Sequence, residues 1–146
     1  MACKVTCTLL SETQNGNIGD DWKYSLEVKV FNEGLKGEGT VSVKKHTLTT
    51  GTTQEPPGPP APLEVAAGEG GAELMIRLTL VATEVDLFKS DSGQTQINVH
   101  MPSPRPGESP VTQETEISVG VRESPGLMDE TAVLVIGVRL VASSDD

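Results

Sequence analysis

The chain has 146 residues, 36% of them hydrophobic, which predicts one domain spanning 1–146. Its formal net charge of −10 at pH 7 repels the phosphates of nucleic acids, so nucleic-acid binding is not expected, and an anionic membrane would be approached only through a bridging cation. No stretch reaches the roughly 18 consecutive apolar residues that a membrane span requires.

Both cysteines lie in the first predicted strand, in "CKVTCTLL". Cys3 and Cys7 share a face of an extended strand but stand roughly 13 Å apart, beyond the Cα separation of about 7 Å that a disulfide allows. Free thiols are typical of a reducing compartment, and "MACKVTCTLL" has no signal-peptide core. We therefore expect a soluble, cytoplasmic protein.

The second predicted strand follows in "WKYSLEVKV", where apolar and polar residues alternate. Such a strand has one face in a core and one in water. An aromatic platform for carbohydrate is the alternative, but three aliphatic residues continue the aromatic face, which favours the core. The residues on that face are Trp22, Tyr24, Leu26, Val28 and Val30.

The same alternation recurs along the chain and predicts seven strands, or eight, with no amphipathic helix between them. This pattern indicates an all-β fold, a single antiparallel β-sandwich. The further strands are expected over residues 40–49, 72–81, 94–101, 115–123 and 132–142.

Two segments rich in proline and glycine, 51–71 and 102–110, are expected to be long loops, because proline removes a backbone donor from a sheet. "PPGPPAP" in the first keeps the PxxP spacing of a polyproline II ligand, through Pro57 with Pro60 and Pro59 with Pro62. No basic residue flanks it, which favours a plain stiff loop.

The last predicted strand, 132–142 ("AVLVIGVRLVA"), is apolar on both faces. Such a strand is either central with both faces covered or half of an interface between subunits. A homo-oligomer formed through this strand is therefore one expectation.

Catalytic signatures are few, so we do not expect an enzyme. His46 and His100 lie far apart, and no nucleophile elbow or phosphate-binding loop is present. Asp91-Ser92-Gly93 is similar to the signature of aspartic proteases, but Lys89 and Ser90 precede it where that family has a buried apolar strand. A β-turn is the favoured interpretation, and a hydrolase using Asp91 is a remote alternative.

The acidic loop before the second strand, "NGNIGDD", has two interpretations. Asn15 and Gly16 are a strong turn pair, so the loop serves first of all as a connection between strands. It also supplies hard oxygen ligands of the kind calcium prefers, from Asn15, Asn17, Asp20 and Asp21.

Together with the strand Tyr24–Val30 and a second acidic stretch, "EVDLFKSDSG", this loop resembles C2 domains, over residues 3–31 and 84–93. The resemblance implies a β-sandwich whose loops at one end bind calcium and then a lipid or a protein. It would make Asp20, Asp21, Asp86 and Asp91 the metal ligands. The Asp-Pro-Tyr of that family is absent here, since Trp22 follows Asp21.

The function expected from the sequence is therefore a non-catalytic interaction or assembly module that presents loops or a sheet edge to a protein partner. The alternative is a calcium-dependent C2-like module that binds lipid or protein.

Overall fold

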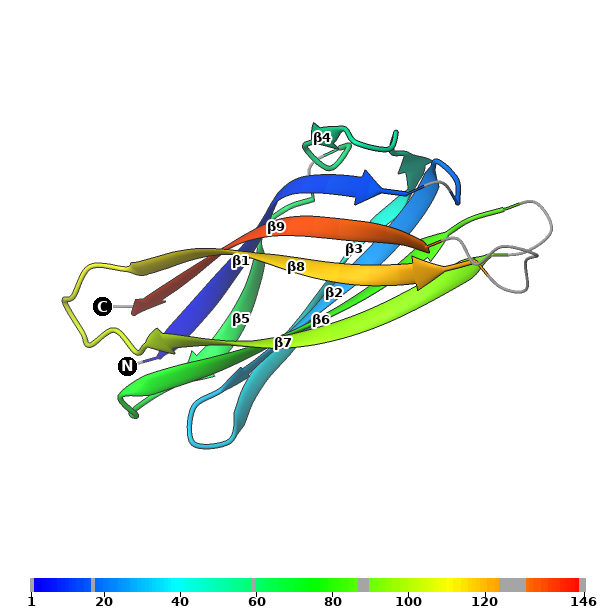
Figure 1. Ribbon diagram of the computed structural model, residues 1–146. Coiled ribbons are helices and arrows are strands. Elements are labelled where there is room, and N and C mark those ends of the chain that lie inside the picture. Colours follow the sequence, from blue (N-terminus) through cyan, green and yellow to red (C-terminus); the bar gives the residue numbers. More distant parts are fainter. Residues whose placement is uncertain (1, 17, 59, 87–89, 124–130, 145–146) are drawn as a thin grey trace.

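The computed structural model describes residues 2–16, 18–58, 60–86, 90–123 and 131–144, which form nine β-strands and no helix. Two antiparallel sheets pack against each other (Figure 1). The predicted all-β sandwich is confirmed, with at least one strand more than expected. The strands are β1 Cys3–Asn15, β2 Asp21–Phe31, β3 Leu35–Thr47, β4 Thr53–Gln54, β5 Leu63–Gly68, β6 Glu73–Glu84, β7 Asp91–Pro102, β8 Val111–Arg122 and β9 Thr131–Ser144.

One sheet has the order β4-β1-β9-β8, with β5 also paired to β1, and the other has the order β3-β2-β6-β7. β4 and β5 pair with opposite ends of β1, β4 with Glu12 and Thr13 and β5 with Cys3–Cys7. The described residues accordingly contain no helix that could cross a membrane.

The core lies between the two sheets and is built by the alternating apolar residues. Leu26 and Val28 of β2 pair with Leu80 and Leu78 of β6, and all four side chains are fully buried. Trp22 is buried too, so the inward orientation predicted for the aromatic face is confirmed and a carbohydrate platform there is excluded.

The strand β9 is central in its sheet, between β1 and β8. Its residues Leu134, Ile136 and Leu140 are fully buried against the other sheet. On the opposite face Val133 is 38% exposed and Arg139 is exposed, so no described part of the chain covers that face completely. Assembly of subunits through β9 stays a prediction.

The prediction of an uninterrupted loop over 51–71 is wrong for β4 and β5. β5 begins directly after the last proline of this segment, and its Val65 and Ala67 point into the core, 2% and 0% exposed. Two small buried residues give too short an alternation to stand out in the sequence. The segment 102–110 behaves as expected beyond Pro102, which ends β7.

Cys3 and Cys7 are both buried and form no disulfide, in agreement with the sequence. Burial raises the pKa of the Cys7 thiol to about 12, so this thiol stays protonated at neutral pH.

Candidate functional site

The connections β1–β2 and β6–β7 lie at the same end of the sandwich (Figure 1). The start of β2 pairs with the end of β6, Trp22 opposite Glu84, and β7 begins with Asp91 opposite Glu84. The backbone N–H of Val85 also donates to the carbonyl oxygen of Asp21, at 2.7 Å. The antiparallel pairing therefore brings the two acidic stretches together.

Three carboxylates meet at this end, which we call the acidic end. One oxygen from each of Glu84, Asp86 and Asp91 lies within 4.8 Å of the others. Within the described ranges this is the one group of three or more such side chains that could hold a metal ion. Asp86 is exposed, whereas Glu84 and Asp91 are only 1% and 7% exposed, so the cluster opens to solvent on one side.

Glu84 is the most confined of the three. Its Oε2 is buried and has no hydrogen-bond partner among the described residues. Gly19, at φ 148°, lies directly against this carboxyl group, and a Cβ at that position would collide with Oε1. Gly19 is itself held from the other side, because its carbonyl oxygen accepts a hydrogen bond from the indole N–H of Trp22 at 3.1 Å. The β1–β2 loop thus closes over the Glu84 carboxyl group.

Burial and the neighbouring carboxylates oppose a negative charge on Glu84. Burial is the largest cause, followed by Asp86, Asp91 and Asp21, and together they raise the pKa of Glu84 from its ordinary value of 4.5 to about 7. Carboxylates this close cannot all be charged at low energetic cost unless a cation joins them. The cluster can therefore hold either a proton or a cation.

The residues predicted as metal ligands are placed differently. Asp86 and Asp91 belong to the cluster, and Asp21, although exposed, is close enough to raise the pKa of Glu84. Asp20 is exposed and stays outside the cluster, and its backbone carbonyl oxygen accepts a hydrogen bond from Leu48 at 2.7 Å. Asn15 is the exposed last residue of β1. Asn17 lies outside the described residues, as do Pro59 and Lys89.

Sequence reasoning missed Glu84, although a signal for it exists. The inward positions of β6 are the even ones, from Leu74 to Ala82, and one further step of the same alternation places Glu84 inward. A carboxylate at the inward position of a strand end is a better marker of this site than the adjacent aspartates of the loop.

Asp91-Ser92-Gly93 is not a β-turn, which corrects the prediction. These residues begin β7, because Asp91 and Ser92 pair with Glu84 and Thr83 of β6. Asp91 is buried, whereas Ser92 is exposed and its hydroxyl group lies 2.8 Å from that of Thr83. Neighbouring side chains of a strand point to opposite faces, so Asp91 and Ser92 do not face a common substrate.

A second buried carboxylate, Glu12 of β1, was also missed. It accepts hydrogen bonds from the hydroxyl group of Tyr24 at 2.7 Å and the side-chain amide of Gln54 at 2.8 Å, and lies 2.6 Å from Nε2 of His46. Nδ1 of His46 lies 2.7 Å from the carbonyl oxygen of Lys44. Glu12 is fully satisfied, which indicates a structural tie between the sheets.

Comparisons of the chain with protein-family models, curated proteins and solved structures find no significant match. The resemblance to C2 domains therefore stays a prediction, and the function is inferred from the geometry of the acidic end.

Proposed function

We propose that this protein is a non-catalytic binding module whose acidic end takes up a divalent cation, with calcium as the expected ion, and presents it to a partner. The observation that carries the proposal is the buried carboxyl group of Glu84, which has an oxygen without a hydrogen-bond partner and lies within 4.8 Å of Asp86 and Asp91. A buried oxygen left in this way is costly, and a cation removes the cost.

The donor set favours calcium over transition metals. All three side chains offer carboxylate oxygens, the hard ligands that calcium and magnesium prefer, and no described histidine or cysteine joins them. Calcium accepts six to eight oxygens at flexible geometry, so three carboxylates would leave positions for water or for an oxygen of a partner. The exposed side of the cluster, at Asp86, is where such a partner would reach the ion.

The charge of the chain gives the cation a further role. With a formal net charge of −10 the free protein repels anionic partners, and a bound divalent ion would offset most of the negative charge at the acidic end and could itself coordinate an anionic group. Contact with an anionic lipid or an acidic protein would therefore depend on the cation, and a membrane would be reached only in its presence.

Thermal unfolding in EDTA and in millimolar calcium tests the proposal. An ion that binds only the folded state at about 100 times its dissociation constant adds roughly 2.7 kcal/mol, which corresponds to about 5–10 °C in the midpoint for a domain of this size. Asp86→Asn and Glu84→Gln should abolish this rise. Glu116→Gln removes one exposed carboxylate from β8 and should leave the rise unchanged.

Two results would contradict the proposal. The first is a midpoint that calcium does not change in the wild-type protein. The second is a rise of equal size in Asp86→Asn, which would assign the effect to general screening of the acidic surface. If magnesium raised the unfolding midpoint more than calcium does, the proposed site would stand, but its preferred ion would be magnesium.

A further inference from the structure

A β-bulge in β3 exposes two consecutive lysines. Trp22 of β2 pairs with His46 and Tyr24 pairs with Val43, so the single residue Lys23 lies opposite both Lys44 and Lys45. A regular strand would turn one of these two lysines inward, whereas the bulge leaves both exposed.

The bulge lies on a free sheet edge. Among the described strands β3 is the outermost of its sheet and pairs only with β2. β5 approaches the first half of β3, where the backbone of Ala66 lies against Gly37 and the side chain of Leu63 lies against Gly39. Because β5 begins at Leu63, residues 40–47 of β3 have no strand on their other side within the part of the chain that is described.

Two hollows flank this half of β3. The first, of about 380 Å³, lies over β3, β2 and β6 and includes the hydroxyl-bearing residues Ser25, Ser42 and Thr83. The second, of about 470 Å³, lies between the bulge and the proline-rich segment that follows β4, with Pro57 and Pro60 on its far side. The free edge of β3 therefore lies in a groove with one apolar wall.

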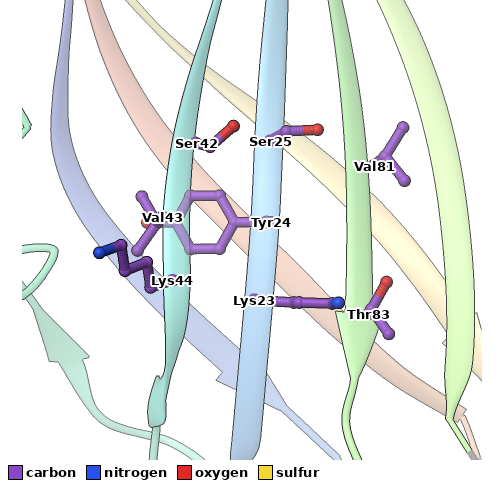
Figure 2. Close-up of a pocket in the computed structure, with 8 residues that line it drawn as sticks. All are labelled: Lys23, Tyr24, Ser25, Ser42, Val43, Lys44, Val81 and Thr83. Carbon is purple, nitrogen blue, oxygen red and sulfur yellow. The ribbon is translucent and has the colours of Figure 1, made fainter.

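Lys23 and Lys44 line the first hollow, and Lys44 and Lys45 line the second. Among the described residues none of Lys23, Lys44 and Lys45 forms an ion pair, in a chain with 21 acidic residues. In Figure 2 Lys44 extends from β3 away from β2, whereas Lys23 extends in the other direction, toward Thr83. Because the two side chains diverge, they do not enclose one compact anion such as phosphate.

We propose that the free edge of β3 with Lys44 and Lys45, which we call the basic edge, docks an extended acidic peptide of a protein partner. An extended peptide can use the backbone groups of an unpaired strand, which a lipid headgroup or a free anion cannot. Its carboxylates would pair with the lysines, and Pro57 and Pro60 would contact its apolar atoms. This docking does not require the cation at the acidic end.

Fluorescence anisotropy in EDTA tests the basic edge, with a labelled eight-residue peptide of alternating Glu and Val as the probe and a peptide of alternating Gln and Val as its control. Saturable binding should be confined to the acidic probe and should weaken with salt. Lys44→Gln/Lys45→Gln should weaken it at least about five-fold, since each surface ion pair contributes modestly. The matched variant Lys4→Gln/Lys36→Gln, on other parts of the surface, should bind as the wild type does. Amide chemical shifts of residues 40–47 should move on binding.

Several results would overturn this inference. One is absence of saturable binding, and another is equal weakening in the two lysine variants. Binding of anionic vesicles in EDTA that is lost in Lys44→Gln/Lys45→Gln, without peptide binding, would assign the lysines to a membrane surface. Self-association of that variant, again without peptide binding, would mean that the lysines only protect the edge from pairing with a second copy. Both assays run in EDTA, so failure here leaves the cation proposal unaffected.

Discussion

At the scale of single residues, Glu84 is subject to two opposing effects. The geometry of the strand directs its side chain into the protein, whereas burial there makes a negative charge on it costly. Its position on β6 turns the side chain inward, and three neighbouring carboxylates and burial penalise the charged form. Without a cation, and between about pH 4.5 and 7, the folded protein therefore keeps a proton on Glu84 that a solvated glutamate would lose.

This proton predicts a pH dependence of stability. The pKa of Glu84 is about 7 in the folded chain and returns toward 4.5 on unfolding, so between these values the folded state binds more protons. The free energy of unfolding therefore falls as pH rises through this interval, by an amount on the order of 1–2 kcal/mol. Urea unfolding in EDTA at about pH 5 and about pH 8 should show the fall in the wild type and a smaller fall in Glu84→Gln. Equal pH dependence of the two proteins would contradict the assignment, and Glu116→Gln controls for the loss of one carboxylate.

At the scale of elements, the buried Glu12 of β1 connects the two sheets and also holds the short strand β4, which follows β3. Its partners come from β2, β3 and β4, through Tyr24, His46 and Gln54. Burial and the adjacent Glu12 raise the pKa of Tyr24, so its hydroxyl group remains protonated and continues to donate.

Tyr24→Phe should consequently destabilise the protein by about 1–3 kcal/mol, because it leaves a buried carboxylate oxygen without its donor. Equilibrium denaturation measures the loss. Thr13→Val is the matched control, since it removes a 2.7 Å hydrogen bond to Thr53 that is exposed, and its effect should stay within about 0.5 kcal/mol. Equal losses of stability in Tyr24→Phe and Thr13→Val would show that the buried hydrogen bond to Glu12 contributes no more than an exposed one.

The strands also show which features of the fold can be predicted from the sequence: regular alternation can, and local changes of register cannot. Long alternating strands such as β2 and β6 are evident, because period two is strong over ten residues. Glu12 is hidden because β1 changes register between Leu9 and Ser11, so a count from Cys3 places its side chain outward. The bulge of β3 is hidden for the same reason, since pairing register is a tertiary property.

The acidic end was partly predictable on the same grounds. The resemblance to C2 domains pointed to Asp86 and Asp91, which belong to the cluster, and also to Asp20, which stays outside it. Which carboxylates meet depends on β6 pairing with both β2 and β7, and this pairing is not encoded in any local pattern.

At the scale of the whole molecule, strand pairing joins distant parts of the sequence. β1 pairs with β9, and β2 pairs with β6 across the intervening β3, β4 and β5. Forming these contacts requires closure of long loops before the contacts stabilise the fold.

Refolding should therefore be slow for a chain of this size, with time constants of roughly milliseconds to seconds. Stopped-flow fluorescence can follow it through Trp22, because it is the single tryptophan and is fully buried. Recovery within microseconds would contradict the dependence on long-range pairing.

The pairing of β1 with β9 has a consequence for biosynthesis. Of the described strands, β8 forms its ladder only with β9, and β1 lies on the other side of β9. Until β9 has left the ribosome, β8 has no strand to join and one edge of β1 stays open, while the β3-β2-β6-β7 sheet is already complete. A nascent chain stalled before residue 131 would thus offer unpaired strand edges, which are templates for aggregation, and would be a substrate for chaperones.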